Sequence, residues 1–262
     1  MFLNIFQFLK RKRGSQATPP KLNEQDQQTL IREFEKKFNL HFNDPQLIIT
    51  ALKHRSYLNI TNEDRIYSNE RLEFLGDAVL DLVVTHYLYE KFPKRTEGEL
   101  SKIKSILVSK PVLADIANQM SLGTFVLINW GEEKTGGRKR QSILGDAMEA
   151  LIGAIYLDQG LEAARAFIQE HLLKNFQKII KRGLYKNYKS ILLEFAQSKG
   201  WEMPLYKVVR EEGPDHAKEF IIEVYVDNRK LGEGRGSSKK MAEQQAARQA
   251  VKKLKLSKEK KI

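Results

Sequence analysis

One apolar stretch of the sequence, residues 69–84, carries carboxylates at helical spacing. Glu73 and Asp77 lie four positions apart and therefore share one face of a helix. One heptad later that face carries Leu80 and Val84, so the acidic stripe runs into an apolar one. An amphipathic helix with a solvated acidic face is the ordinary alternative. Because burying a carboxylate without a cation is unfavourable, we interpret the pattern as a metal site.

A second stretch, residues 143–157, repeats this arrangement more sharply. Its only charged residues are Asp146 and Glu149, which lie three positions apart and point the same way from an otherwise apolar helix. The tetrapeptide Leu-Gly-Asp-Ala occurs in both stretches, at 75–78 and 144–147. This echo is too short to prove a duplication, but it indicates two helices of similar role packed face to face.

Gly76 lies in the middle of the first predicted helix, where glycine costs roughly 1 kcal/mol relative to alanine unless another group approaches the backbone closely. We therefore expect the two helices to bring their four carboxylates together. Carboxylates with no histidine or cysteine among them form a hard-oxygen site that suits Mg²⁺ or Mn²⁺ better than Zn²⁺. The chemistry expected at such a site is phosphoryl transfer to water activated by a divalent metal.

Several blocks of the sequence resemble the ribonuclease III family of double-strand-specific endoribonucleases. The most specific is Glu-Arg-Leu-Glu-Phe-Leu-Gly-Asp-Ala-Val-Leu at 70–80, which looks like the defining motif of that family. Residues 51–57, 96–101 and 142–153 resemble its other blocks, in the right order, and the resemblance covers roughly residues 22–256.

The resemblance implies a role for each acidic residue of these blocks. The metal ligands would be Glu73, Asp77, Asp146 and Glu149, of which Asp77 and Glu149 would be the pair essential for cleavage. Glu70 and Glu97 would be auxiliary acidic residues lining the cleavage valley. Phe74 would insert into the partner subunit of a homodimer.

The charge of the chain is concentrated at its two ends. The 262 residues carry a formal net charge of +12, of which residues 1–21 supply +5, residues 22–183 supply 0 and residues 184–262 supply +7. The neutral region is the one that bears the carboxylates, so attraction of an anionic substrate is assigned to a separate module. With 41% hydrophobic residues the chain can form packed cores, and with no cysteine it has neither disulfides nor thiolate sites. We expect a cytoplasmic protein.

Composition predicts four segments: a basic N-terminal arm (1–21), a catalytic domain (22–183), a basic second domain (184–256) and a basic tail (257–262). In the arm, apolar residues precede the basic run instead of following it, which argues against a secretory signal. We expect a flexible arm that touches RNA or has no role. Membrane contact through an amphipathic anchor is an alternative that we do not favour.

Between residues 22 and 181 the pattern is helical throughout, with no convincing strand, so the first domain is predicted to be an all-helical bundle. Its last helix is expected at 161–180, and residues 131–140 are expected to form a basic, glycine-rich loop that positions the Asp146 helix. His54 could suggest a general base, but a lone histidine just past a helix end is more often a packed structural residue.

The second domain shows a different pattern. It reads as one helix, three strands with alternating apolar residues and a final helix, at 188–198, 205–210, 220–226, 229–233 and from 239 onward. This α-β-β-β-α order, with Gly-Ser-Ser-Lys-Lys-Met-Ala-Glu-Gln entering the last helix, resembles the double-stranded RNA-binding domain. The predicted fold is thus multidomain, all-α followed by α+β.

Lys239 and Lys240 fall in the first turn of that last helix, where the helix dipole disfavours cations. An anion that bridges both lysines and the free amides would relieve this conflict, which suggests phosphate binding. The resemblance adds minor-groove contacts from Ser190, Glu194, Gln197 and His216, and a phosphate contact from Gln244. Leu193 departs from the polar residue found at its position in many bacterial relatives.

The resemblance implies a Mg²⁺-dependent endoribonuclease, with Mn²⁺ able to substitute and no small-molecule cofactor. It would hydrolyse phosphodiester bonds in double-stranded RNA, leave 5′-phosphates and 3′-hydroxyls, and act as a homodimer in rRNA and mRNA processing. Two alternatives stay open. A protein that only binds duplex RNA is disfavoured because all four carboxylates are present, and a phosphohydrolase of free nucleotides because it would not need the basic module.

Overall fold

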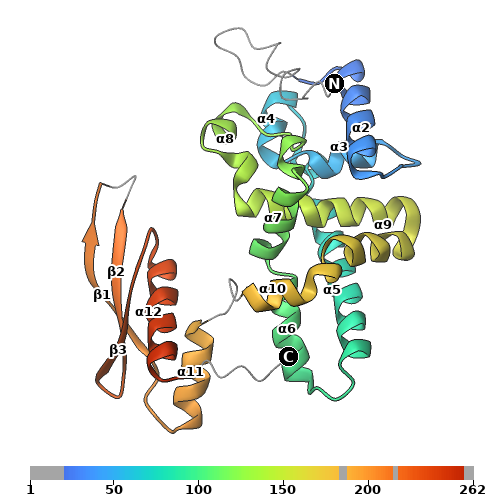
Figure 1. Ribbon diagram of the computed structural model, residues 1–262. Helices are drawn as coiled ribbons and strands as arrows, with labels where there is room; N and C mark the ends of the chain where they lie inside the picture. Colours follow the sequence, from blue (N-terminus) through green and yellow to red (C-terminus); the bar gives the residue numbers. More distant parts are fainter. Residues whose placement is uncertain (1–20, 183–187, 215–217, 257–262) are drawn as a thin grey trace. The chain divides into compact units, whose positions relative to one another are not determined.

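A computed structural model describes residues 21–182, 188–214 and 218–256 (Figure 1). The chain divides into two compact units, residues 1–185 and 186–262, which are described separately. Apart from Lys21, the predicted N-terminal arm lies outside the described residues, as does the predicted C-terminal tail. Among the described helices, none combines the length and apolar composition that spanning a membrane requires.

The first unit is helical, as predicted. Its α-helices are α2 (Glu24–Phe38), α3 (Gln46–Leu52), α4 (Leu58–Thr61), α5 (Glu70–Lys91), α6 (Glu97–Leu107), α7 (Lys110–Gln119), α8 (Trp130–Lys134), α9 (Gln141–His171) and α10 (Phe176–Arg182). Short 3₁₀ turns are η1 (Arg55–Tyr57), η2 (Arg65–Tyr67), η3 (Leu122–Thr124), η4 (Gly137–Lys139) and η5 (Leu173–Asn175). Within the described residues of this unit, strand pairing is limited to one isolated bridge between Lys53 and Leu127.

Polar side chains define where several of these helices begin. Thr96 accepts a hydrogen bond from the backbone of Glu99, whose carboxylate accepts one in return, so α6 begins with a capping box. Helix α3 begins at Gln46, directly after Asp44 and Pro45, and Asp44 Oδ1 accepts a hydrogen bond of 3.0 Å from Gln46 N.

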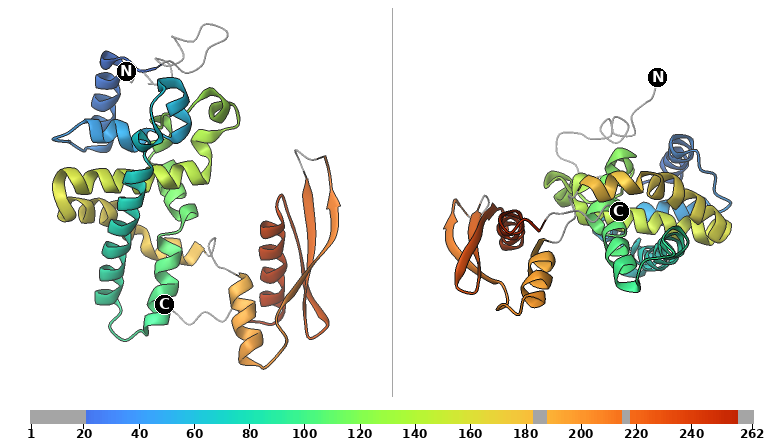
Figure 2. Two further views of the ribbon diagram at one scale, coloured as in Figure 1. Left: turned by 180° about the vertical axis from the view of Figure 1, so that it is seen from behind. Right: turned by 60° about the horizontal axis from the view of Figure 1, so that its bottom comes forward.

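The core of the first unit is built around two crossing helices. In Figures 1 and 2, α9 passes across α5, and α7 and α3 pack against α9. Leu80 of α5, Leu113 of α7, and Leu144 and Met148 of α9 are fully buried there. The carboxylates predicted to bind metal thus project from the two central helices of the core.

The expected closing helix at 161–180 is wrong in its extent. Helix α9 already includes residues 141–159, and Gly160 interrupts it with φ 82° and ψ −176°, a backbone conformation that favours glycine. The helix then continues to His171 and is followed by η5 and α10. An apolar pattern that resumes after one glycine cannot reveal such a turn.

The segment 131–140, expected to be a loop, contains α8 and η4. Arg138 holds it in place, since its guanidinium donates to the carbonyl oxygens of Gly123 (2.9 Å) and Val126 (2.6 Å) and pairs with Glu133 at 2.7 Å. Arg140 is the N-cap residue of α9, and its carbonyl oxygen accepts from Leu144 N. The segment therefore positions the start of the Asp146 helix, as expected.

The second unit has the predicted α-β-β-β-α order. Its elements are α11 (Tyr188–Ser198), β1 (Leu205–Glu212), β2 (Glu219–Val226), β3 (Arg229–Gly236) and α12 (Lys239–Lys253). The strands form an antiparallel sheet in the order β1-β2-β3. Ile222, Val224 and Val226 are buried at alternating positions of β2, in agreement with the predicted pattern.

Close packing of α12 on β3 depends on small residues. A Cβ placed on Gly232 would lie 2.3 Å from the carbonyl oxygen of Ala246, and one on Gly234 would lie 2.2 Å from that of Ala242. Glycines therefore let the helix backbone rest on the strand. Because they show no apolar alternation, the predicted third strand ended at residue 233 instead of Gly236.

Candidate metal centre and nucleic-acid interface

Backbone contact between α5 and α9 creates the candidate metal centre. A Cβ on Gly76 would lie 1.7 Å from the carbonyl oxygen of Glu149, and one on Gly153 would lie 2.3 Å from that of Leu72. No larger residue fits at this crossing without separating the helices. The close approach expected at Gly76 is confirmed, and it carries the acidic residues of both helices to one place.

Three of the four predicted ligands converge at the crossing. Glu73, Asp146 and Glu149 offer carboxylate oxygens that all lie within 4.8 Å of one another. Glu149 is buried, with 4% of its surface exposed, whereas Glu73 and Asp146 are half-buried. Asp77 is exposed and is not part of this trio, although its charge acts on Glu149.

Burial and mutual repulsion shift the pKa values in this cluster. Burial raises the pKa of Glu149 to about 8, and Asp77, Glu73 and Asp146 add to the rise while Lys110 opposes it. Burial, with the charge of Asp146, also raises the pKa of Glu73. Ionising all of these carboxyl groups is therefore unfavourable in the protein alone, and a bound cation would offset that cost.

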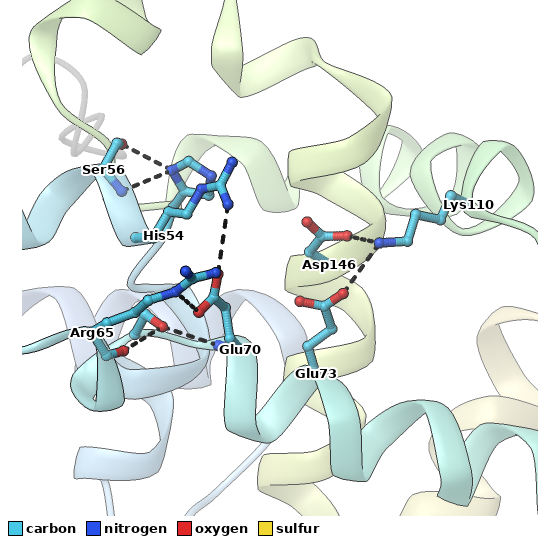
Figure 3. Close-up of polar contacts among 9 residues, drawn as sticks. His54, Ser56, Arg65, Glu70, Glu73, Lys110 and Asp146 are labelled. Atoms are coloured by element: carbon cyan, nitrogen blue, oxygen red, sulfur yellow. Dashed lines mark hydrogen bonds and ion pairs between the residues drawn. The ribbon is translucent and has the colours of Figure 1, made fainter.

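A lysine that the sequence analysis missed lies between two of these carboxylates. The Nζ of Lys110, which belongs to α7, lies 3.1 Å from Glu73 Oε1 and pairs with Asp146 Oδ1. Figure 3 shows the lysine in contact with both carboxylates. Burial lowers the pKa of Lys110, but its hydrogen bonds to the two carboxylates outweigh burial and raise it above the ordinary value. The lysine stays protonated and compensates part of the negative charge.

Oxygen donors at this spacing fit a hard divalent cation. The trio is made only of carboxylates, one of them buried, and an ammonium group already lies against two of them. Such a donor set suits Mg²⁺ or Mn²⁺. The residues present therefore fit a divalent metal ion.

The two predicted auxiliary residues lie outside the trio. Glu70 forms an ion pair with Arg65 at 2.7 Å and a longer one with Arg55 at 3.8 Å, and the hydrogen bond from Arg65 lowers the pKa of Glu70 (Figure 3). Glu97 is exposed in the first turn of α6, where its Oε1 accepts a hydrogen bond of 2.6 Å from Ser101.

His54 is a structural residue, as expected. It is 9% exposed, and its Nδ1 accepts a hydrogen bond from Ser56 N at 3.2 Å and lies 2.9 Å from Ser56 Oγ (Figure 3). Its backbone amide donates to the carbonyl oxygen of Leu127 at 3.1 Å. These contacts account for the histidine as a packed, hydrogen-bonded residue.

In the second unit, the lysines predicted to bind phosphate lie where the sequence placed them. Lys239 and Lys240 are exposed in the first turn of α12, which Ser238 caps by accepting from Met241 N at 3.3 Å. Lys239 forms an ion pair of 3.3 Å with Glu211 of β1. Two cations therefore lie beside the free amides of a helix N-terminus.

The other predicted RNA contacts are distributed over α11 and α12. Glu194 and Gln197 are exposed on α11, and Ser190 is half-buried there. Gln244 has a structural contact that the sequence did not suggest, since its Oε1 accepts a hydrogen bond of 2.9 Å from Tyr188 N at the start of α11. His216 lies outside the described residues.

Comparisons with known proteins agree with both units. A family model described as Ribonuclease-III-like matches residues 44–176, and one described as double-stranded RNA binding motif matches residues 188–254. Over 242 residues the chain is 45% identical to Ribonuclease 3 of Bacillus cereus (strain AH187), a match that covers 90% of this chain and 97% of that protein. Ribonuclease 3 of Bacillus anthracis (strain A0248) matches equally well.

Solved structures give the same result for the first unit. The nuclease domain of ribonuclease III from Campylobacter jejuni is similar with 47% identity and a TM-score of 0.51. The match covers 56% of this chain and 99% of that domain.

Proposed function

The chain belongs to the ribonuclease III family and is an endoribonuclease that hydrolyses phosphodiester bonds in double-stranded RNA, and we propose that it cleaves at the crossing of α5 and α9. The observation that carries this proposal is the buried carboxylate of Glu149, held beside Glu73 and Asp146. Ionising this buried carboxyl group is unfavourable unless a cation lies beside it. Processing of rRNA and mRNA, with 5′-phosphate and 3′-hydroxyl products, fits this family.

The proposed cation is Mg²⁺, with Mn²⁺ able to replace it. Glu73, Asp77, Asp146 and Glu149 would hold it. When bound, a divalent ion supplies an activated water and neutralises charge on the phosphate. Asp77 and Glu149 are the proposed essential pair, as the resemblance to the family implies. The charge of Asp77 also raises the pKa of Glu149, which supports its place near the centre.

Glu70 and Glu97 are proposed as auxiliary acidic residues that line the cleavage valley. The pairing of Glu70 with Arg65 and Arg55 provides an acid beside exposed guanidinium groups, which can bind phosphate oxygens. Glu97 lies exposed on a neighbouring helix.

The second unit binds double-stranded RNA. We propose that Lys239, Lys240 and Gln244 contact phosphates and that Ser190, Glu194, Gln197 and His216 contact the minor grooves. The exposed lysines at the N-terminus of α12 support the phosphate contacts. Recognition would then depend on the shape of the A-form duplex more than on its sequence.

We propose that the enzyme is a homodimer in which Phe74 contacts the partner subunit. Phe74 is 82% exposed on α5, and Leu82 and Tyr89 of the same helix are also exposed. The nuclease domain of the Campylobacter jejuni enzyme has a region involved in dimer formation. Exposed apolar side chains along one central helix are what such an interface requires.

We also propose a cytoplasmic location. For the domain boundaries we retain residues 22–183 for the nuclease domain and 184–256 for the RNA-binding domain.

The experiment that tests the cleavage centre separates binding from cutting. Purified Glu149→Gln protein and the unsubstituted protein are incubated with a long perfect RNA duplex, in Mg²⁺ and in EDTA, and the ends of the products are sequenced. We expect Glu149→Gln to bind the duplex as well as the unsubstituted protein does and to cut at least a thousandfold more slowly. Glu90→Gln, which removes an exposed carboxylate from α5, is the matched control and should cut normally.

Two outcomes would contradict the proposal. Normal cutting by Glu149→Gln would place the active centre elsewhere. Binding without any cutting by the unsubstituted protein would mean that the nuclease fold serves only to hold RNA.

A further inference from the structure

Lys110 is the cation that the structure places against the proposed metal ligands. Its Nζ lies 3.1 Å from Glu73 Oε1 and pairs with Asp146 Oδ1, so one ammonium group joins carboxylates from both central helices (Figure 3). The side chain is 47% exposed, whereas those of Glu73 and Asp146 are 25% and 22% exposed. The ammonium group is therefore more accessible to solvent than the two carboxylates with which it pairs.

The position of Lys110 in its helix is unfavourable unless it has an anionic partner. It is the first residue of α7, directly after the N-cap Ser109, where the positive end of the helix dipole repels a cation. Helices normally carry acidic residues there, as α6 does with Glu97 and Glu99. The pairing with Glu73 and Asp146 accounts for a lysine at this site.

Space for the lysine is provided by the residue that precedes Asp146. A Cβ on Gly145 would lie 3.3 Å from Lys110 Cβ and 3.4 Å from its Cγ. Any side chain at position 145 would therefore press on the stem of Lys110. The absence of a side chain at Gly145 therefore lets the stem of Lys110 extend toward the carboxylates.

We propose that Lys110 is a built-in counter-ion that occupies part of the metal centre in the metal-free enzyme and is displaced when a divalent cation binds. This inference rests on the proposed metal centre. A cation between Glu73 and Asp146 would need the carboxylate oxygens that Lys110 now engages. Lys110 would thus be a positioning residue that holds the ligands together beforehand and weakens metal affinity by competition.

The test measures metal binding without RNA. Thermal unfolding of the full-length chain is followed while MgCl₂ is titrated, and the half-saturating concentration is compared between variants. We expect Lys110→Gln to bind Mg²⁺ about fivefold to tenfold more tightly, because it frees the ligands from two partly exposed ion pairs. In EDTA the same variant should melt at a lower temperature than the unsubstituted protein, and saturating Mg²⁺ should close that gap.

Two further variants serve as controls. Lys104→Gln removes the same charge from a lysine that pairs with Asp81 at 2.8 Å, and it should leave the half-saturating concentration within twofold. Lys110→Arg keeps the charge and should stay close to the unsubstituted protein. Unchanged or weaker Mg²⁺ binding by Lys110→Gln would overturn the proposal.

Glu149→Gln distinguishes a failure of this inference from a failure of the metal centre itself. If Glu149→Gln loses Mg²⁺-dependent stabilisation while Lys110→Gln behaves like the unsubstituted protein, the metal centre stands and only the role of Lys110 is refuted. If Glu149→Gln binds Mg²⁺ normally, the metal centre is wrong and the lysine proposal falls with it.

Discussion

The buried carboxylate of Glu149 predicts how the stability of the metal-free enzyme depends on pH. Burial raises its pKa from 4.5 to about 8 in the folded protein. Between these values the folded state binds a proton that the unfolded state has released, so the free energy of unfolding falls as pH rises. Glu149→Gln removes the titrating group and should therefore become more stable than the unsubstituted protein at high pH.

The magnitude follows from the distance between the two pKa values. At pH values well below the pKa of Glu149 in the folded protein, each pH unit lowers the free energy of unfolding by about 1.4 kcal/mol. Raising the pH from about 6 to about 8 therefore lowers it by about 2 kcal/mol through Glu149 alone. For a domain of this size that corresponds to a fall of about 4–8 °C in melting temperature. Glu149 is 4% exposed, so solvent screens little of this effect.

The assay is thermal unfolding of the full chain in EDTA, at several pH values, for the unsubstituted protein and for Glu149→Gln. Two histidines titrate in the same range with the opposite sign. Burial lowers the pKa of His54 and of His171. The unfolded state therefore binds more protons at these histidines than the folded state does, and their contribution to the free energy of unfolding rises with pH. Both proteins keep these histidines, so the difference between their melting temperatures at each pH gives the contribution of Glu149.

The reasoning would be refuted if the melting temperatures of the two proteins changed with pH in the same way between about pH 6 and pH 8. That result would mean that Glu149 ionises in the folded state as easily as in water. Saturating Mg²⁺ provides an internal check. A bound cation stabilises the ionised carboxylate, so it should remove most of the pH dependence of the unsubstituted protein and little of that of Glu149→Gln.

Three other predictions follow from the contacts described above. Gly76→Ala forces the backbones of α5 and α9 apart and should lower the free energy of unfolding by about 3 kcal/mol or more. Gly98→Ala is the control, because nothing lies near its added Cβ, and it should leave the free energy of unfolding unchanged. Chemical denaturation measures both. Lys239→Ala combined with Lys240→Ala should weaken duplex binding and lower the slope of log K against log salt by about two, and an unchanged slope would contradict the phosphate contacts. Phe74→Glu should convert the proposed dimer to monomers in sedimentation experiments, and a dimer that survives it would exclude Phe74 from the interface.

The parts of the fold that depend on local patterns were predictable from the sequence. Alternating apolar residues defined β2, and helical periodicity defined α11 and the start of α5, which continues beyond the predicted stretch 69–84 to Lys91. Glu73 and Glu149 could be proposed as ligands because an acidic residue in an apolar helix must find a cation. Gly76 added the prediction that another helix crosses there.

The parts that depend on distant contacts were not predictable. Lys110 meets Asp146 across 36 positions, and the only local indication was a lysine in an unfavourable first turn. The segment containing Arg138 looked like a loop because the carbonyl groups that accept its hydrogen bonds lie 12 to 15 positions earlier. Gly160 gave no sign that its φ would be positive.

The repeated tetrapeptide Leu-Gly-Asp-Ala shows how one local pattern can serve two different contacts. In the first copy, Gly76 makes room for the backbone of Glu149, and in the second, Gly145 makes room for the stem of Lys110. The first glycine therefore allows the buried carboxylate of Glu149 to approach the centre, and the second allows the ammonium group of Lys110 to do so. The counterpart of Gly76 at the crossing is Gly153 and not Gly145, since Gly76 lies against the carbonyl oxygen of Glu149 and Gly153 against that of Leu72. The repeated tetrapeptide therefore reflects a shared need for space and does not mark the residues that pair across the two helices.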